Sequence, residues 1–377
     1  MVNYDFLSVY FYSVPNLRFL KFNQNYETLQ LKNTLKIKSG KDQKQVEVEN
    51  GIYNIYGTGG IIGHTNTFLY DKESVGIGRK GTIDKPVYFN QPFWTVDTLF
   101  YSEIYEGFIP KYIFYLFQTI NWKKYNTSTG VPSLTSSSIE NIEKSFPCYD
   151  EQLKVANFLT MIDMRIETQI KIIELKQSLI KDIEDRILWK TTNTQTKPIR
   201  EFLTEINNKS IIQNQYPLLS STKKGLFLQT DYFNKEAASS NNIGYKIVHK
   251  GDIIISPQNL WMGNITYNDK FDNGLVSPSY RIYKVKEEYN AFYISRILMS
   301  YRALSLYKNI SEQGASIVRR NLNVDAFNEL CFPIPNIKKQ DEVGLFLSKL
   351  HQELKCETWI LMQLKSQKNY LLNNMFI

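Results

Sequence analysis

The sequence predicts an α+β protein: two mixed α/β globular domains joined by two long antiparallel coiled-coil helices, with pseudo-two-fold symmetry. Three observations lead to this prediction. A globular segment followed by a long helical segment occurs twice, each helical segment begins just after a Phe-Pro pair, and both carry apolar residues spaced by seven. The chain has 377 residues, 42% of them hydrophobic, which suits two or three domains with ordinary cores.

The repeat is clearest where the two long helical segments begin. "FPCYDEQLKVANFLTMI" starts at Phe146, and "FPIPNIKKQDEVGLFLSKL" starts at Phe332. With a gap of two residues, Gln152 aligns with Gln340, and the apolar residues that follow stay in register. An internal repeat on this scale decides the architecture, because each copy is a structural unit of its own.

Both helical segments carry a heptad seam, the pattern of a coiled coil. In the first segment the predicted helix-pairing residues are Leu159, Ile162, Ile166, Ile173, Ile180 and Ile187. In the second segment they are Leu347, Leu350, Leu354, Leu361, Leu364 and Leu371. Each helix would span roughly 35–40 residues, or about 55 Å at 1.5 Å per residue.

Polar residues interrupt the two seams at different places. Gln169 and Lys176 occupy seam positions in the first segment. Glu357 and Lys368 do so in the second. This difference favours antiparallel pairing of one helix with the other. The alternative is two unrelated amphipathic helices on separate domains, and the shared frame argues against it.

The repeat also sets the predicted boundaries. They are an N-terminal extension at 1–25, a first globular domain at 26–149, a central helical region at 150–190, a second globular domain at 191–334 and a C-terminal helical region at 335–377. Each globular domain combines Gly- and Tyr-rich strand patterns with a short amphipathic helix, predicted at 109–122 and at 291–307. A polar loop follows each short helix, at 126–135 and at 311–322.

Charge and cysteine content restrict the partner and the compartment. The net charge is +8 and the isoelectric point is near 9.0, which favours a polyanionic partner. Cys148, Cys331 and Cys356 form neither a disulfide framework nor a zinc pattern, so we expect a reducing, cytoplasmic compartment. The N-terminus lacks the basic start of a signal peptide, and no apolar run reaches about 18 residues, so no membrane contact is expected.

A glycine motif raises the possibility of a nucleotide-binding enzyme. "GIGRKG", from Gly76 to Gly81, matches the dinucleotide-binding pattern GxGxxG. That pattern requires a helix after the glycines, and "TIDKPVYFN" instead reads as another strand. We therefore predict a tight β-turn that carries Arg79 and Lys80 outward. The glycines of "YNIYGTGGIIGHT" lie between strand-like pieces in the same way and lack the GK[ST] of a P-loop.

No catalytic or metal-binding constellation is visible. The three histidines lie far apart in sequence, and no group of residues has metal-ligand spacing. The chain also lacks the Asn-Pro-Pro-Tyr or Asp-Pro-Pro-Tyr box of base methylation. We therefore predict no catalytic residues and no metal site.

Two sets of phrases resemble the specificity subunits of type I restriction–modification systems. The first half contains "YNIYGTGGIIG", "VGIGRKGTIDKPVYF" and "TGVPSLTSSSIENIEKSFPCYDEQLKVANFL". The second half contains "YPLLSSTKKGLFLQTDYFNKE", "YKIVHKGDIIISP", "GLVSPSYRIYKV" and "FPIPNIKKQDEVGLFLSKL". Their order, repeated in two halves with a helix after each, makes the resemblance specific. The first 13 residues, "MVNYDFLSVYFYS", have no obvious counterpart in the family.

The resemblance implies a function without chemistry in this chain. The two globular domains would be target recognition domains, each reading one half of a split target in double-stranded DNA. The helices would set the spacing between the halves and dock two modification subunits, which bind S-adenosylmethionine and methylate adenine. Restriction subunits, which use ATP and Mg, can join such complexes. The chain itself would hold no cofactor.

Candidate DNA contacts lie on loops and hairpins, where side chains can reach a groove. Lys and Arg would neutralise phosphates, and Arg, Asn, Gln, Ser and Thr would read base edges. In the first domain they are Tyr56, Gly57, Thr58, Gly59, Gly60, Arg79, Lys80, Thr127, Ser128 and Thr129. In the second domain they are Ser220, Ser221, Thr222, Lys223, Lys224, Gln258, Asn259, Trp261, Arg319 and Arg320. Trp261 could pack against a sugar or base, or be a covered core residue.

Three alternatives stay open at this stage. The chain could be an enzyme built around its glycine loops, although no helix follows them. It could be a coiled-coil interaction protein that binds no DNA. It could also be a member of the family that works only in modification.

Overall fold

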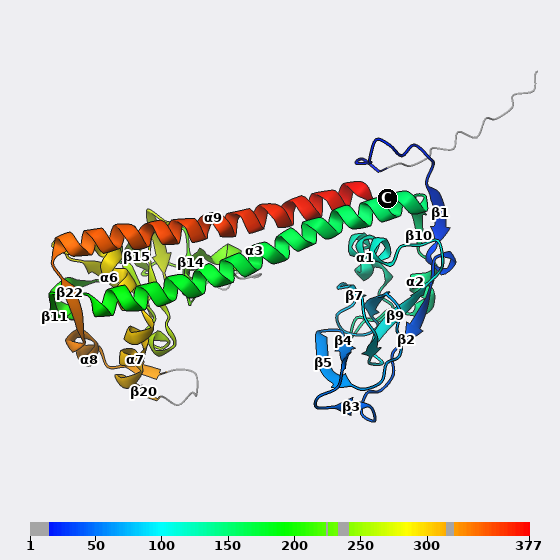
Figure 1. The fold of residues 1–377 in the computed structure, drawn as a ribbon. Coiled ribbons are helices and arrows are strands. Elements are labelled where there is room, and N and C mark those ends of the chain that lie inside the picture. Colours follow the sequence, from blue (N-terminus) through cyan, green and yellow to red (C-terminus); the bar gives the residue numbers. More distant parts are fainter. Residues whose placement is uncertain (1–14, 224, 233–240, 314–319) are drawn as a thin grey trace, which may run out of the picture. The chain divides into compact units, whose positions relative to one another are not determined.

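The computed structural model describes residues 15–223, 225–232, 241–313 and 320–377 (Figure 1). The chain divides into two compact units. Unit 1 contains the residues up to 170 together with 359–377, and unit 2 contains 171–358. The first long helix, α3 (Tyr149–Lys190), and the second, α9 (Ile337–Met375), each contribute residues to both units.

Unit 1 is built from strands that precede the long helix α3. The strands are β1 Glu27–Gln30, β2 Leu35–Ser39, β3 Glu47–Val48, β4 Tyr53–Gly57, β5 Gly60–Thr65, β6 Ser74–Gly78, β7 Val87–Phe89, β8 Phe93–Thr95, β9 Leu99–Ile104 and β10 Glu143–Phe146. The short helices are η1 Leu31–Asn33, α1 Pro110–Thr119, η2 Trp122–Tyr125 and α2 Ser136–Glu140. One sheet has the order β2-β9-β6-β7, a second has the order β3-β5-β4-β8, and β1 pairs with β10.

The core of unit 1 forms where helix α1 meets sheet β2-β9-β6-β7 and the long helices. Pro110 suits the first turn of α1, because proline has no N–H to donate there. The buried face of α1 includes Tyr112 and Tyr115. The same cluster contains Leu159 from α3 and Met375 from α9, so each long helix has one end in this core.

Unit 2 repeats this plan with its own strands and helices. The strands are β11 Thr194–Pro198, β12 Leu203–Ile206, β13 Leu219–Thr222, β14 Gly225–Leu228, β15 Lys246–His249, β16 Ile253–Ile255, β17 Ile265–Tyr267, β18 Asn273–Val276, β19 Arg281–Val285, β20 Ser311–Gln313, β21 Arg320–Leu322 and β22 Cys331–Pro335. The short helices are α4 Ile199–Phe202, α5 Gln229–Tyr232, η3 Leu260–Met262, α6 Ala291–Leu298, α7 Tyr301–Asn309 and α8 Val324–Glu329.

The main sheet and one strand pair correspond between the two units. The order β12-β19-β16-β17 in unit 2 matches β2-β9-β6-β7 in unit 1, and the pair β11–β22 matches β1–β10. The parallel pairing of β4 with β8 has its counterpart in a parallel bridge between Leu218 and Leu275. The predicted repeat is therefore present in the backbone topology.

Two predicted elements of unit 2 differ from the structure. The helix predicted at 291–307 is two helices, α6 and α7, because the Ser300 hydroxyl accepts a hydrogen bond from the Ala303 N–H and starts a new helix. The polar loop predicted at 311–322 contains two strands, β20 and β21, which pair antiparallel. Side-chain capping and pairing between strands override the local pattern at both places.

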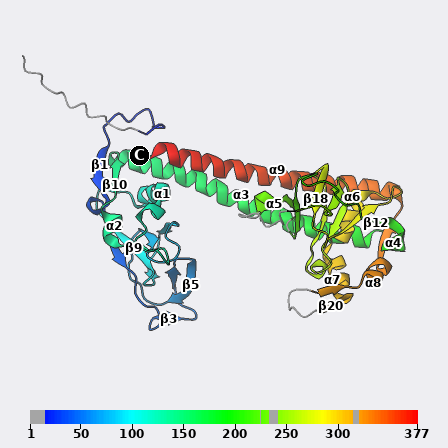
Figure 2. The ribbon, with the colours of Figure 1, turned by 180° about the vertical axis from the view of Figure 1, so that it is seen from behind.

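Helices α3 and α9 run side by side in each unit (Figures 1 and 2). In unit 1, Ile162 and Ile166 of α3 form a buried cluster with Leu364 of α9. In unit 2, the Lys176 ammonium lies 2.8 Å from a Glu357 carboxylate oxygen. Further along α3 in the same unit, Glu184 contacts His351 of α9, so the two helix segments of unit 2 are antiparallel.

The predicted seam residues face inward along both helices. Most are buried, and the others are half-buried; the half-buried ones are Ile187, Leu350, Leu354, Leu361 and Leu371. Lys176 and Glu357, two of the polar interruptions, pair with one another. Within the described ranges, no helix is both long and apolar enough to span a membrane.

Candidate nucleic-acid interface

A tight hairpin forms the first part of the candidate surface in unit 1. β4 and β5 are joined by the two-residue loop Thr58–Gly59, with Gly57 paired to Gly60. Two-residue hairpin loops need residues with positive φ at or beside the turn, and Gly60 has a φ of +122°. Gly57 is buried, Thr58 and Tyr56 are half-buried, and Gly59 is exposed at the tip.

The connection after β6 lies beside this hairpin tip. A Cβ atom on Gly81 would lie 3.9 Å from the Thr58 hydroxyl oxygen, so the two segments are neighbours. The Gly81 N–H donates to the Pro132 carbonyl at 2.9 Å, and the Leu134 N–H donates to the Arg79 carbonyl at 2.9 Å. The hairpin tip, the connection after β6 and the loop before α2 therefore meet. We name this group loop surface 1: residues 56–60, 79–81 and 126–134.

The loop before α2 has a defined shape. The Asn126 carboxamide oxygen accepts from the N–H groups of Ser128, at 3.1 Å, and Ser133, at 2.9 Å. The Thr127 N–H donates to the Ser133 carbonyl at 2.9 Å and closes the loop. Thr127 and Thr129 are exposed on it, and Ser128 is half-buried. The predicted contact group at 127–129 is thus held near the hairpin tip.

The two cationic residues of loop surface 1 differ. Lys80 is exposed and forms no ion pair with any residue that the structure describes. Arg79 is half-buried, donates to the Asp97 carbonyl at 3.4 Å and lies 5.9 Å from the Phe100 ring centre. Lys80 is therefore free to meet a phosphate, while Arg79 is partly engaged within the fold.

The predicted tight turn at the glycine motif is wrong in its details. Gly76 and Gly78 lie inside strand β6 and not in a turn. A Cβ atom on Gly76 would lie 2.7 Å from the Phe89 ring, and one on Gly78 would lie 1.9 Å from the Thr82 carbonyl oxygen. Only Gly81 has a left-handed φ, at +89°. The connection runs from 79 to 86 and leads into strand β7, so the helix that a dinucleotide site requires does not follow.

Unit 2 has the same kind of hairpin between β13 and β14. Thr222 pairs with Gly225, whose φ is +123°, across a two-residue loop. Lys223 is exposed in this loop, and Lys224 lies outside the described residues. Ser220 and Thr222 are half-buried.

One predicted contact on this hairpin faces the interior. Ser221 is buried, and its hydroxyl lies 3.0 Å from the Asn264 carboxamide oxygen and 2.8 Å from the Thr266 hydroxyl. Ser221 was predicted to meet DNA together with its neighbours Ser220 and Thr222. Side chains alternate along a strand, so the middle residue of the three points into the fold. The bond to Asn264 connects the hairpin to the segment 256–264.

That segment and strand β21 complete the surface in unit 2. The Arg320 N–H donates to the Gln258 carbonyl at 3.2 Å. The Arg320 guanidinium carbon lies 4.5 Å from the centre of the Trp261 ring. Gln258 is exposed, Asn259 and Trp261 are half-buried, and Arg319 lies outside the described residues. We name the group loop surface 2: residues 220–223, 256–264 and 320–322.

The two loop surfaces use the same backbone arrangement. In unit 1, the segment that follows β6 is hydrogen-bonded to the segment that precedes α2. In unit 2, the segment that follows β16, the strand equivalent to β6, is hydrogen-bonded to the segment that precedes α8. The carbonyl groups of Arg79 and Gln258 are the acceptors. The structure therefore gathers most of the predicted contacts into one group in each unit.

Sequence reasoning missed two exposed isoleucines beside loop surface 1. Ile61 and Ile62 follow the hairpin loop, next to a register shift between Ile55 and Tyr56. A bulge re-aims side chains, which explains how two consecutive apolar residues are both exposed. The signal in the sequence is a pair of isoleucines where a half-buried strand should alternate.

Sequence reasoning also missed how each long helix is fixed to its unit. The buried Gln152 side chain accepts from the Ile109 N–H at 3.1 Å and donates to the Pro147 carbonyl at 3.0 Å. Gln340 does the same in unit 2, with the Asn290 N–H at 3.0 Å and the Pro335 carbonyl at 2.8 Å. We name each arrangement a glutamine clip. The aligned glutamines in the sequence were the available signal.

A second connection ties each short helix to the long helices, with different chemistry in the two units. In unit 1, which we call joint 1, the Tyr115 hydroxyl donates to Asp163 at 2.8 Å, and Lys368 pairs with Asp163 at 2.7 Å. In unit 2, joint 2, Arg296 donates twice to Glu184, at 2.6 and 2.8 Å. His351 lies 2.8 Å from the same carboxylate.

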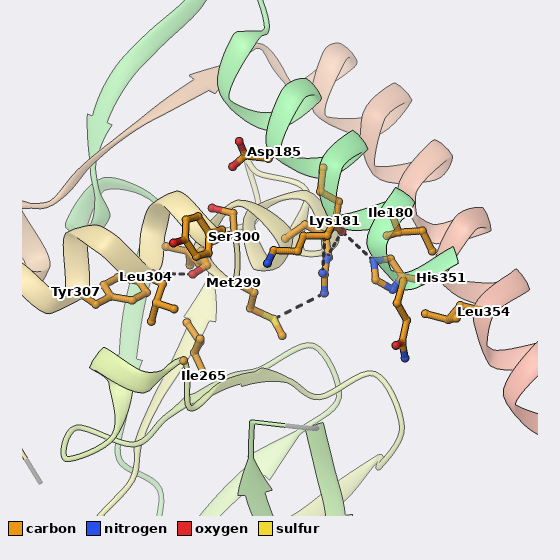
Figure 3. Close-up of a pocket in the computed structure, with 16 residues that line it drawn as sticks. Ile180, Lys181, Asp185, Ile265, Met299, Ser300, Leu304, Tyr307, His351 and Leu354 are labelled. Carbon is orange, nitrogen blue, oxygen red and sulfur yellow. Dashed lines mark hydrogen bonds and ion pairs between the residues drawn. The ribbon is translucent and has the colours of Figure 1, made fainter. Parts of the chain in front are cut away.

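Joint 2 borders a cavity of about 350 Å³ among α3, α6, α7 and α9 (Figure 3). Lys181 comes from α3, Ser300 and Tyr307 from the α6–α7 region, and His351 from α9 (Figure 3). Burial would raise the pKa of Glu184, but the hydrogen bonds from His351 and Arg296 outweigh it, so its pKa is lowered. The carboxylate of joint 2 is therefore ionised and fully paired.

The comparisons with known proteins first define a fold class. The S subunit of a type I restriction–modification system from M. genitalium matches with a TM-score of 0.62 and 16% identity, over 97% of this chain and 99% of that one. A chain from a structural study of complex assembly and conformational transition of the type I R-M system matches with a TM-score of 0.56 and 10% identity, over 93% and 97%. The fold is therefore that of S subunits.

The sequence of the first half adds a family match. Residues 23–177 match the family model of the type I restriction modification DNA specificity domain. The resemblance to type I specificity subunits is confirmed. The comparison with curated proteins gave no match. No group of histidine, cysteine, aspartate and glutamate side chains within the described ranges could hold a metal ion.

Proposed function

We propose that this chain is the DNA-recognition subunit of a type I restriction–modification complex and has no catalytic activity of its own. Each unit would read one half of a bipartite target. The observation that carries the proposal is the pair of loop surfaces, which occur at equivalent places in two units with the same strand order. Two such surfaces allow one chain to read both halves of a split target.

The loop surfaces suit both kinds of DNA contact. Lys80 and Lys223 are exposed cations that would neutralise phosphates and make binding depend on salt. Thr127 and Thr129 in unit 1 and Gln258 in unit 2 are exposed groups that can bond to base edges. Ser221 is left out, because its hydroxyl is used inside the protein.

The long helices would set the spacing of the two half-sites and dock two modification subunits. The proposed arrangement is pseudo-two-fold, with one recognition domain for each half-site. Support for docking comes from apolar side chains exposed at helical spacing on α3, where Ile172, Leu175 and Leu179 lie on one face. Leu175 and Leu179 are 71% and 58% exposed, and a partner that covered them would remove this apolar surface from water.

Chemistry in this proposal belongs to the partners. Modification subunits would bind S-adenosylmethionine, and restriction subunits, where present, would use ATP and Mg. The complex would work in the cytoplasm on double-stranded DNA and would have no membrane contact. These assignments are supported by the family of residues 23–177.

Sequencing the methylated bases of cells that carry this chain with a modification subunit tests the proposal. We expect a target of two short half-sites separated by unread base pairs. A continuous target would contradict the bipartite assignment. Adenine methylation that does not require this chain would contradict its role in recognition.

A second experiment tests the absence of catalysis. The purified chain is incubated with DNA, Mg²⁺ and S-adenosylmethionine, with and without the modification subunit. We expect methyl transfer only with the partner. Turnover by the chain alone would favour the enzyme alternative, and failure to bind DNA with the partner at low salt would favour a coiled-coil protein without a DNA role.

A further inference from the structure

We propose that Arg320 reads a guanine in the half-site bound by unit 2, and that Trp261 is the positioning residue that orients it. The inference rests on the proposed function and deepens it, because it assigns a base to one side chain. It starts from the stack at loop surface 2, where the guanidinium carbon of Arg320 lies 4.5 Å from the centre of the Trp261 ring.

The backbone of Arg320 is held on both sides. Its N–H donates to the Gln258 carbonyl at 3.2 Å, and β21 pairs antiparallel with β20. The side chain begins from a fixed point, and the indole face restricts the plane of the guanidinium. An arginine stacked on an aromatic ring has less rotational freedom to lose when it binds a ligand.

The Arg320 guanidinium is also uncommitted. It forms no ion pair and no side-chain hydrogen bond with any residue inside the described ranges. The other arginines of unit 2 at its surfaces and joints behave differently: Arg281 pairs with Glu205, Arg296 with Glu184 and Arg302 with Asp185. A half-buried arginine with its fork of donors unused is suited to an external acceptor.

The geometry favours a base edge over a phosphate. A phosphate accepts from any direction and can be met by a freely rotating lysine or arginine. A fixed guanidinium plane matches the two in-line acceptors O6 and N7 of guanine in the major groove. The exposed Gln258, whose carbonyl anchors Arg320, places a second base-reading group beside it.

Trp261 acts through its ring face and not through its N–H. The Nε1 atom is buried and has no acceptor among the residues that the structure describes. A phenylalanine at this position would keep an aromatic face and lose no bond to a described residue. An aliphatic residue would lose the stack. This difference separates a positioning role from simple filling of space.

Unit 1 provides an internal control. Its loop-surface arginine, Arg79, donates to the Asp97 carbonyl, and the aromatic ring beside it is that of Phe100, 5.9 Å away, and not a tryptophan. Changes at Arg320 or Trp261 should therefore alter the half-site read by unit 2 and leave the other half-site unchanged.

The experiment compares methylated target sequences of cells that carry the modification subunit and one variant of the full chain. Arg320→Ala should relax one G·C position of one half-site, with discrimination reduced roughly 5- to 150-fold. Arg320→Lys keeps the charge but not the fork and should relax the same position. Trp261→Leu should relax it too, while Trp261→Phe should preserve it.

The outcomes separate the inference from the proposed function. If Arg320→Ala and Arg320→Lys both leave every base preference unchanged, the inference is wrong. It is also wrong if Arg320→Ala relaxes the position but Arg320→Lys keeps the original base preference, because Arg320 is then a phosphate contact. If Trp261→Phe relaxes the site as much as Trp261→Leu, the ring does not position Arg320. If the unaltered chain directs no bipartite methylation, the proposed function itself fails.

For variants that lose methylation altogether, DNA binding is measured instead to test base preference. The purified complex with the modification subunit is tested on duplexes that differ only at the assigned position, and its thermal unfolding is compared with that of the unaltered complex. A folded Arg320→Ala complex that binds all four duplexes equally supports the inference. One that keeps the unaltered preference overturns it.

Discussion

Joints 1 and 2 occupy corresponding places in the two units and use different chemistry. Joint 1 centres on Asp163, bonded to a tyrosine and a lysine, whereas joint 2 centres on Glu184, bonded to an arginine and a histidine. The glutamine clips beside them are the same in both units. The comparison teaches that the two units share the contacts that glutamine side chains make to backbone groups, whereas their pairs between side chains differ.

The physical reason lies in what each contact must satisfy. A clip satisfies backbone groups that are present whatever the neighbouring side chains are, so a glutamine serves both units. A joint needs only mutually compatible partners, so several combinations work. If this is correct, removing either clip should have the same effect, while removing the joints should not.

The largest expected effect is at joint 2. Glu184→Ala leaves Arg296 and His351 without their shared acceptor inside the protein, and breaking a buried ion pair costs about 3–5 kcal/mol of unfolding free energy. Chemical denaturation measures it. Asp182→Ala is the control, because Asp182 is exposed and its pair with Arg186 on the same helix contributes about 0.3–0.5 kcal/mol. Equal effects of the two variants would show that joint 2 is not a buried pair.

The second effect tests the clips. Gln152→Ala and Gln340→Ala each remove the side-chain partner of one part-buried backbone N–H and one buried carbonyl, at a cost of about 2–3 kcal/mol. We expect similar losses of unfolding free energy for both variants. Gln352→Ala, on the exposed side of α9, should change little. Very different losses for the two clips would break the idea that the repeat preserves them for the same reason.

The third effect concerns the two loop surfaces and DNA. Lys80→Ala and Lys223→Ala should each weaken binding of the complex to DNA without changing base preference, and each should reduce the salt slope of binding by about 1. Titrations at several salt concentrations measure this. An effect at only one of the two lysines would indicate that the loop surfaces contact the DNA backbone differently.

The smallest effect is a pH dependence specific to joint 2. Because the pKa of Glu184 is lowered in the folded protein, its carboxylate stabilises the fold above the ordinary value of 4.5, and this contribution is lost as the pH falls through the folded pKa. The stability difference between the unaltered chain and Glu184→Gln should shrink below pH 4.5. Denaturation series at pH 3.5 to 7 would check it, and a constant difference would contradict it.

Much of the fold was predictable because it depends on local periodicity. The heptads run through Ile162, Ile166 and Leu364, which lie in one buried cluster. The absence of a helix after the glycine motif was also visible, because Pro86 and the residues around it favour a strand. The loops that hold the candidate contacts were predictable, because glycine and polar residues mark loops. The direction in which each side chain points was not predictable.

The sequence by itself determined the repeat, the heptad seams and the lack of a dinucleotide site, because each is carried by neighbours along the chain. Only the tertiary structure decided that Ser221 faces inward, that Gly76 and Gly78 make room for other segments, and that Arg320 stacks on Trp261. The same is true of joint 2, whose partners come from three helices. These features depend on distances between residues far apart in sequence, and no local pattern encodes such distances.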